Sequence, residues 1–387
     1  MTFDKFSNTI TVYRKSFEYA SGIIHKIINF NLKNMDEENI QYEIDYLPVG
    51  NGKIGGDAIA IRFGNFADPN EQYVVVIDGG TKESGAKLVE HIKQYYNTDY
   101  VDLVVATHLH QDHTSGLTEV LENLRVGKLA IHLPWDYASD IKRMTKTESS
   151  VSRIETKLEK SINTVSNLCD LAEEKGVEII QSFRGDVLLD KFIVLSPSED
   201  YYKELLANFE KTPEVKPEHK ILDEIDSFVK GAIEWIEEEI RVETLSDDYE
   251  DTTAENNSSI VLLFQINGKR YLFTGDAGKD ALFKVIEYAN ENNIDLNNID
   301  FLDVPHHGSK RNLGPSILNV LSPNKAFISC PKDGDPKKPS RKVVNALIRR
   351  NCEVYTTKGN SLGHNIAIRR NGWGPATPET FFNVVEK

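Results

Sequence analysis

An apolar run that ends in a cluster of histidines is the feature that most limits how this chain can fold. Residues 104–117 read VVATHLHQDHTSGL. The apolar residues predict a buried strand. Because side chains alternate along a strand, His108 and His110 should lie on the same side of it, and Asp112 and His113 should follow in the turn. This HxHxDH pattern predicts two groups of ligands that can face two cations.

A purely structural alternative is that Asp112 or Thr114 caps the helix that follows. Histidine is scarce in this chain, with ten in 387 residues. Helix capping does not account for the three neighbouring imidazoles, so we favour metal binding. The three cysteines, at positions 169, 330 and 352, form no CxxC pair and are expected to be reduced, buried thiols. Any metal must therefore be held by histidine and aspartate.

Two other segments carry ligands of the same kind. Asp276 stands in YLFTGDAG, and the doublet His306–His307 stands in DVPHHGS, each at the end of a predicted strand. Binding residues collect on loops that rigid strands hold in place. Alone, Asp276 could be a helix N-cap, but together with HLHQDH both segments become candidates for one site. Strand alternation places the two histidines of the doublet in different directions and leaves open which of them binds metal.

Alternating strand and helix patterns predict an α/β chain with mixed sheets. An N-terminal helical segment is expected within residues 1–40, and one domain over residues 41–387. The predicted strands and helices of that domain are listed here in chain order. Strands are expected at 41–50, 57–64, 73–80, 102–108, 128–134, 177–183, 186–190, 191–197, 301–308, 325–330 and 353–357, with a hairpin over 258–276 that turns at Asn267–Gly268, and helices at 85–97, 147–175, 279–292, 314–320 and 340–350.

An acidic segment at about 199–255 interrupts this alternation. Apolar residues at helical spacing predict an amphipathic helix over 219–241. The segment could fold over the site as a lid, could form a homodimer or partner surface through Trp235, or could pack on the domain as additional core. The chain carries a net charge of −15, which argues against a general polyanion binder.

The sequence has no stretch that approaches the roughly 20 apolar residues of a membrane span. The N-terminal residues MTFDKFSNTITVYRK contain no apolar core of a signal peptide. We therefore expect a cytoplasmic protein with no membrane partner.

The motifs together resemble the metallo-β-lactamase superfamily, and most closely the C-terminal hydrolase domain of the competence protein ComEC and its free-standing relatives. The stretches that carry this resemblance are LPVGNGKIGGDAIAI, VVVIDGG, VVATHLHQDHTSGL, ENNSSIVLLFQINGKRYLFTGDAG and FLDVPHHGSKRNLGPSILNVLSPNKAFIS, together with GVEIIQSFRGDVLLDKFIVLSP. The resemblance implies a four-layer αββα sandwich with two metal ions at one edge.

Transferred residue by residue, the resemblance also implies a role for each candidate. His108 and His110 would bind one metal, Asp112, His113 and His307 the other, and Asp276 both, while His306 would face the substrate, Asp78 would orient a metal-binding histidine, and Asp57 would belong to the glycine-rich first hairpin. Asp112 would orient the attacking water, and His306 would protonate the leaving group.

The chain departs from the family pattern in three places, of which one is a glycine-rich first hairpin that is longer than usual. Many members have one more histidine, which completes the first metal site, and this sequence offers no clear equivalent, because His132 lies too early. Relatives often carry His-Pro where this chain has Lys338–Pro339. A lysine can neutralise a phosphate but cannot act as a near-neutral acid.

These features predict a metal-dependent hydrolase. Zinc suits the ligand set, with manganese or iron as alternatives. The favoured substrate is a phosphodiester in nucleic acid or a nucleotide, with Ser309, Lys310 and Lys338 near its phosphate. Other basic residues after the doublet could line the phosphate path: Arg311, Lys332, Lys337, Arg341 and Lys342. A hydrolase of a lactone, thioester or amide, and a regulatory module with an incomplete metal site, remain the alternatives.

Overall fold

The computed structural model describes residues 40–50, 55–68, 71–209, 212, 234–332, 338–366 and 370–387. The chain divides into two units, of which one comprises residues 41–265 and 269–387. The other comprises residues 1–40 and 266–268, and lies almost wholly outside the described residues. The helix predicted near the N-terminus therefore also lies outside them.

The first sheet contains seven strands, and its central strands β3 and β4 contain continuous apolar runs. In β3, β4 and β5 the chain runs in the same direction, and β1, β2 and β15 add antiparallel pairs at one edge. Central strands that are covered on both faces need continuous apolar residues, which VVVI and LVV supply. The spatial order is β15 (Leu362–His364), β1 (Gln41–Tyr46), β2 (Ala58–Gly64), β3 (Gln72–Gly79), β4 (Tyr100–Val105), β5 (Arg125–Ala130) and β6 (Glu178–Ile180).

The second sheet also contains seven strands. Its β11 to β14 are parallel neighbours, whereas β7, β8 and β10 form antiparallel pairs. Asn267 and Gly268 both have positive φ, as the predicted hairpin turn requires. The spatial order is β14 (Glu353–Thr356), β13 (Lys325–Ile328), β12 (Phe301–Asp303), β11 (Lys269–Phe273), β10 (Val261–Ile266), β8 (Phe192–Ser196) and β7 (Val187–Leu188).

Aromatic side chains from both sheets meet in the core between them. The ring of Phe63 in β2 lies 6.2 Å from Phe192 and 5.6 Å from Phe264. Tyr42 in β1 and Tyr271 in β11 join their hydroxyls in a 2.5 Å hydrogen bond. Burial of these rings holds the two sheets face to face, and their buried hydroxyls are satisfied by each other.

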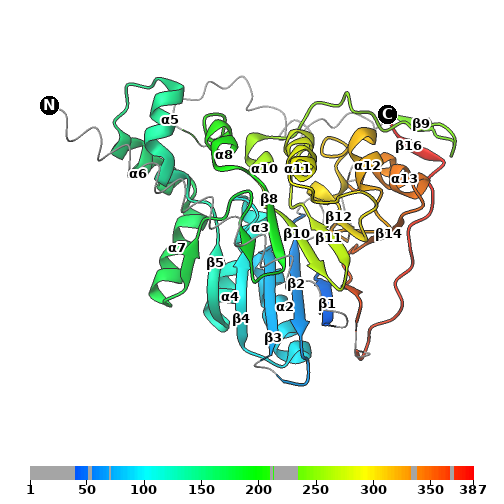
Figure 1. The fold of residues 1–387 in the computed structure, drawn as a ribbon, viewed down its shortest axis with the longest axis horizontal. Helices are drawn as coiled ribbons and strands as arrows, with labels where there is room; N and C mark the ends of the chain where they lie inside the picture. Colours follow the sequence, from blue (N-terminus) through cyan, green and yellow to red (C-terminus); the bar gives the residue numbers. More distant parts are fainter. Residues whose placement is uncertain are drawn as a thin grey trace. The chain divides into compact units, whose positions relative to one another are not determined.

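Helices cover the outer faces of both sheets. On the first sheet they are α2 (Lys82–His91), α4 (Leu117–Asn123) and α7 (Asn163–Glu174), with α5 (Ala138–Thr145) and α6 (Val151–Ser161) beyond them. On the second they are α8 (Glu199–Leu206), α11 (Lys279–Glu291), α12 (Pro315–Leu321) and α13 (Arg341–Arg349). Figure 1 shows α11, α12 and α13 beside one another along the second sheet. The predicted four-layer sandwich is confirmed.

Two predicted helices differ from the observed ones. The helix expected over 147–175 is two helices, α6 and α7, because Ile162 between them leaves helical geometry with φ −112° and ψ 47°. The apolar spacing continues through this break, so periodicity could not reveal it. The helix expected over 219–241 is wrong at its end, since Trp235–Glu237 forms strand β9, paired with β16 (Val384–Glu386). Residues 219–233 lie outside the described part.

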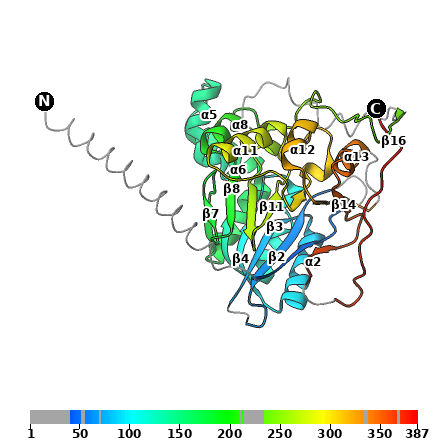
Figure 2. The same cartoon turned by 45° about the vertical axis from the view of Figure 1, so that its right-hand side comes forward.

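The acidic strap, which we define as residues 234–253, packs on the domain. Figure 2 shows β16 close to α13, and β9 of the strap pairs with β16. Arg349 of α13 donates to the backbone carbonyls of Glu239, Ile240 and Val242. This part of the acidic segment therefore packs on the domain, and the lid and the homodimer or partner surface stay predictions. Among the described residues, no helix is both long and apolar enough for a membrane span.

Candidate metal centre

The candidate ligands come from the carboxyl ends of strands in both sheets. Asp78 is the second-last residue of β3, and the HLHQDH motif follows β4 and continues through the short helix α3 (Gln111–Thr114). Asp276 follows β11, and the doublet follows β12 in the single turn η4 (Pro305–Gly308). The loops at these strand ends bring together the segments that the sequence predicted to share one site.

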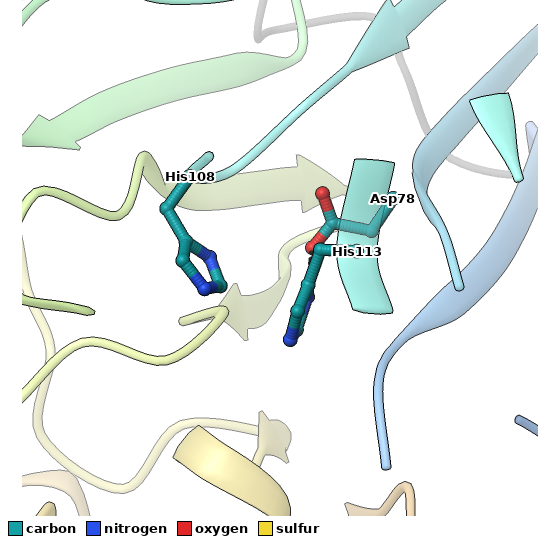
Figure 3. Close-up of side chains that lie close together, drawn as sticks. All are labelled: Asp78, His108 and His113. Carbon is teal, nitrogen blue, oxygen red and sulfur yellow. Dashed lines mark hydrogen bonds and ion pairs between the residues drawn. The ribbon is translucent and has the colours of Figure 1, made fainter. Parts of the chain in front are cut away.

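Asp78 fixes two residues of the HLHQDH region. Its carboxylate accepts hydrogen bonds from the backbone N–H of Thr107 at 2.8 Å and from the Thr107 hydroxyl at 2.6 Å. It also lies 2.7 Å from Nδ1 of His113, and Figure 3 shows the carboxylate against that ring. A proton held on Nδ1 leaves Nε2 of His113 as the ligand atom. Asp78 thus lies where its predicted orienting role requires.

Asp276 is placed between the histidines of the two sheets. Its Oδ2 lies 3.7 Å from His108 Nε2 and 3.6 Å from His306 Nε2. Its Oδ1 lies 3.4 Å from His113 Nε2 and 3.9 Å from His307 Nε2. The carboxylate therefore presents a different oxygen to each of two groups of imidazoles.

Among the described residues, possible ligand atoms lie within 4.8 Å of one another in four groups, and two of these consist of residues that the sequence analysis assigned to the two cations. One group is His108, His110 and Asp276, and the other is Asp112, His113 and His307. Three buried atoms in these groups make no hydrogen bond with a described residue, namely His113 Nε2, His307 Nε2 and Asp276 Oδ1. Buried polar atoms without partners are costly in a protein interior. Divalent cations would satisfy all three.

The pKa shifts of Asp276, His307 and His113 bear on whether this cluster can bind cations. Burial raises the pKa of Asp276, but His306, His113 and His307 outweigh this effect and hold it well below its usual range. Burial lowers the pKa of His307 to about 4, against the attraction of Asp276. Burial likewise lowers the pKa of His113, yet Asp276 and Asp78 raise it well above normal. A cation would displace the proton of His113 on binding.

Asp57 lies beside this cluster, and Asp303 is a buried carboxyl that the sequence analysis missed. Asp57 lies 3.8 Å from Nδ1 of both His113 and His307. Burial and the nearby charge of Asp303 raise the pKa of Asp57 well above its usual range. Burial raises the pKa of Asp303 to about 7, although Tyr46 donates a 3.0 Å hydrogen bond to it. Asp303 closes β12, so its position at a buried strand end was the available signal.

Three further polar groups near the ligands also escaped the sequence analysis. Nδ1 of His307 donates to the backbone carbonyl of Ser329 at 3.1 Å, which leaves its Nε2 facing Asp276. Asn312 lies 3.0 Å from Nδ1 of His306. The Thr107 hydroxyl lies 3.1 Å from Nδ1 of His108. All three residues lie in stretches that the sequence analysis had quoted, but their contacts with the histidines depend on the folded chain.

Ser309, Lys310 and Lys338, which the sequence analysis placed near a substrate phosphate, have different partners in the structure. Nζ of Lys338 lies 2.6 Å from Nε2 of His306, within the site. Ser309 is buried and accepts a hydrogen bond from the backbone of Arg311. Lys310 donates to the carbonyl of Lys387 and lies 4.6 Å from the ring centre of Tyr249. Of the three, Lys338 is the one that these contacts place against the histidines.

The acidic strap contacts most of the remaining basic residues that could have lined a phosphate path. Lys342 donates to the hydroxyl of Tyr249 at 2.7 Å, and Arg311 pairs with Glu250 at 3.6 Å. The guanidinium of Arg341 lies 4.5 Å from the ring centre of Trp235. Lys337 lies outside the described residues. Arg311, Arg341 and Lys342 therefore already contact the strap, and a long polyanion would have to compete with it for these side chains.

His132 is a core residue. Its Nε2 pairs with the carbonyl of Ser182 at 2.9 Å, and its ring stacks on Phe183 at 4.6 Å. These partners account for its buried polar atom, in agreement with the expectation that His132 does not complete the first metal site.

Gly116, directly after the HLHQDH motif, packs against the turn that carries Asp78. A Cβ at Gly116 would lie 1.9 Å from the carbonyl oxygen of Gly79. We expect Gly116→Ala to lower the free energy of unfolding by about 1–3 kcal/mol, because the loop must shift to relieve the overlap. Thermal unfolding followed by circular dichroism measures this change. In the control Gly374→Ala, where a Cβ meets nothing within 4 Å, the melting temperature should not change; equal curves for the two variants would contradict the packing.

Comparisons with known proteins agree with this geometry. ComE operon protein 3 of Bacillus subtilis (strain 168) is 31% identical over 137 residues, which cover 35% of this chain and 17% of that protein. Recombination protein 2 of Haemophilus influenzae (strain ATCC 51907 / DSM 11121 / KW20 / Rd) is 27% identical over 180 residues, which cover 45% and 22% of the two chains. The chain spans about a fifth of the length of these relatives. They confirm the predicted resemblance to ComEC-like proteins.

A solved structure described as a new diphosphatase from the PhnP family is also similar, with 11% identity and a TM-score of 0.37, covering 84% of this chain and 98% of that one. The model of the metallo-beta-lactamase superfamily matches residues 66–331, which is more than half of the chain. The matched residues include the HLHQDH motif, Asp276 and the histidine doublet. The sandwich, the placement of the HLHQDH motif and this match lead to one conclusion: the chain belongs to the metallo-β-lactamase superfamily.

Proposed function

We propose that this chain is a metal-dependent hydrolase that holds two divalent cations, most suitably zinc with manganese or iron as alternatives, and cleaves a phosphodiester in nucleic acid or a nucleotide. One observation carries the proposal: the buried atoms His113 Nε2, His307 Nε2 and Asp276 Oδ1 converge without hydrogen bonds to the described residues. Imidazole nitrogens and carboxylate oxygens are donors that zinc accepts.

The separations between these donors support cations rather than direct hydrogen bonds. Two ligands at about 2.0–2.1 Å from one tetrahedral zinc lie roughly 3.3 Å apart. The distances from Asp276 to the four facing imidazoles are 3.4, 3.6, 3.7 and 3.9 Å. Two cations bound there would supply an ionised water near neutral pH and would neutralise charge on the scissile group.

The protein's own residues would orient the reactants. Asp112 is grouped with His113 and His307. Burial raises the pKa of Asp112, but the nearby histidines, His113 first, outweigh burial and lower it, so the carboxylate can accept a hydrogen bond from the attacking water. Lys338 brings an ammonium group to the same site, where it can neutralise a phosphate oxygen. Lys338 contacts the candidate site, whereas Arg311, Arg341 and Lys342 contact the strap, and this distribution favours a nucleotide or a strand end over a long duplex.

The predicted acid role of His306 is not favoured by its surroundings. Nδ1 of His306 lies within hydrogen-bond distance of Asn312. Burial together with Lys338 lowers the pKa of His306 to about 3. A neutral histidine bonded in this way has no proton on Nε2 to give to a leaving group. The leaving group would instead take its proton from water in the site.

The assay that tests the proposal compares wild type with Asp112→Ala on three substrates: a generic phosphodiester, single-stranded DNA and a lactone. We expect metal-dependent hydrolysis of a phosphodiester by wild type, and a loss of about 10²-fold or more in the variant, because a positioned proton acceptor contributes about 10²–10⁴-fold. Turnover of the lactone alone would indicate hydrolysis at carbon. Fewer than one bound ion per purified chain would indicate a regulatory module, and full activity of Asp112→Ala would refute the mechanism.

A further inference from the structure

The histidine doublet divides between the two oxygens of Asp276. Both histidines have left-handed backbone geometry, with φ 50° at His306 and 57° at His307. Such backbone strain in non-glycine residues persists only where the surrounding structure enforces it. Nε2 of His306 faces Oδ2, which His108 also faces, whereas Nε2 of His307 faces Oδ1, which His113 also faces. Each carboxylate oxygen thus meets one imidazole from each sheet.

Asn312 determines which nitrogen of His306 carries the proton. The amide nitrogen of Asn312 donates to the backbone carbonyls of Asp276 at 2.9 Å and Ala277 at 3.2 Å. Its oxygen is therefore turned toward Nδ1 of His306, 3.0 Å away, and accepts the proton of that nitrogen. The amide of Asn256 lies farther from the same nitrogen, at 3.5 Å. A neutral imidazole has one donor nitrogen and one acceptor nitrogen, so Nε2 of His306 carries a lone pair and is the acceptor.

Lys338 gives independent support for this assignment. An ammonium group has only donors, and Nζ of Lys338 lies 2.6 Å from Nε2 of His306. The contact requires an acceptor at Nε2. The nitrogen that faces Asp276 Oδ2 is therefore available to a cation once the lysine moves aside.

We propose that His306 is the ligand that completes the first metal site, in place of the histidine that this sequence lacks, and that Asn312 is its positioning residue. The site then consists of His108, His110, His306 and Oδ2 of Asp276. His110 Nδ1 lies 3.1 Å from His108 Nε2, and the distances from Oδ2 to the other two imidazoles are 3.6 and 3.7 Å. These three separations lie close to the roughly 3.3 Å expected for two ligands of one tetrahedral zinc. His306 belongs to none of the groups whose ligand atoms all lie within 4.8 Å of one another, so its ring must move toward His108 and His110 when the cation binds. The inference rests on the two-cation function proposed above.

Zinc titration against a chromogenic chelator tests the assignment on the full chain. Wild type should bind two ions. His306→Gln should bind one ion with unchanged affinity and the other at least roughly tenfold more weakly, which is the scale of loss when a metal site loses support. Retention of two ions at wild-type affinity by His306→Gln would overturn the inference while leaving the proposed function intact. A wild type that binds no ion would refute both.

Paired substitutions identify which ion His306 holds. His306→Gln combined with His110→Gln removes two ligands of the same ion, so one tight ion should remain. His306→Gln combined with His113→Gln affects both sites, so no tight ion should remain. The reverse pattern would assign His306 to the second site and overturn the inference.

Two further variants and one spectrum separate ligation from a structural role. Asn312→Leu should weaken the first ion by about 10–100-fold, and Asn312→Asp, which retains an acceptor, should restore it. Lys338→Met should tighten that ion, because the lysine no longer competes for Nε2. In wild type loaded with ¹¹³Cd, Nε2 of His306 should show a coupling to cadmium in the ¹⁵N spectrum. Absence of that coupling in a protein that binds two cadmium ions would refute the assignment without reference to any variant.

Discussion

Replacing Asp276 by asparagine is expected to remove both cations and to abolish hydrolysis. Its two oxygens face the two groups of imidazoles at 3.4–3.9 Å. An amide keeps the shape of the side chain but loses the charge and one of the two acceptor oxygens. We expect the rate to fall by roughly 10³-fold or more, since one preorganised electrostatic group alone is worth about 10²–10³ in kcat.

Metal analysis and the phosphodiester assay measure this result together. The control is Asp99→Asn, which removes an exposed carboxylate that pairs with Arg125 at the amino end of β4, opposite the end that the HLHQDH motif follows. The control should keep two ions and wild-type turnover. If Asp276→Asn kept both ions and its activity, the carboxylate could not be the shared ligand, and the arrangement proposed here would be wrong.

Replacing Arg370 by methionine should produce the largest loss of stability. Arg370 is buried and bonds Asp45 through two nitrogens, at 2.6 and 2.8 Å, and Glu43 at 2.8 Å. Both carboxylates are fully buried in β1. Removing one partner of a buried ion pair costs about 3–5 kcal/mol, because a charge is left uncompensated. The melting temperature should fall by roughly 4–6 °C.

The pH dependence of this loss follows from Asp45. Burial raises the pKa of Asp45, but hydrogen bonds from His91 and Arg370 outweigh burial and lower it below 3.8. Stability from an acid with a lowered pKa is complete above the unfolded-state value and is lost as pH falls through the folded-state value. The difference between wild type and Arg370→Met should therefore narrow at acid pH.

Thermal unfolding of Arg125→Met is the matched control for the arginine. Arg125 pairs with Asp99 at 2.7 Å, but both side chains are largely exposed. Solvent screens such pairs, so the melting temperature should stay at its wild-type value. Equal melting temperatures for Arg370→Met and wild type would show that the buried cluster does not hold the C-terminal residues against β1.

The sequence was sufficient for the central strands and for the segments that meet at the site. VVVI and LVV in β3 and β4 are long enough apolar runs to exclude an exposed position, and Asn267–Gly268 allows few structures other than a tight turn. Short edge strands such as β9, β15 and β16 were not predicted. Their three residues each carry too little periodicity, and they form because a partner strand lies beside them.

The ligand types were also predictable, whereas their supporting contacts were not. HLHQDH, TGD and HHGS identify donors through residue chemistry alone. Asn312 and the carbonyl of Ser329 act through positions that only the folded chain brings beside the doublet. The sequence therefore left open which histidine of the doublet binds which cation. The proposed assignment rests on the two oxygens of Asp276, which face different histidines.

Anomalous diffraction at the zinc absorption edge, from crystals grown with excess zinc, tests the central claim most directly. The account predicts two peaks about 3.5–4 Å apart, one on each side of the Asp276 carboxylate, with the nearer atoms supplied by the HLHQDH loop and the histidine doublet. A map with no peak at Asp276, or with zinc bound only at surface residues, would contradict it.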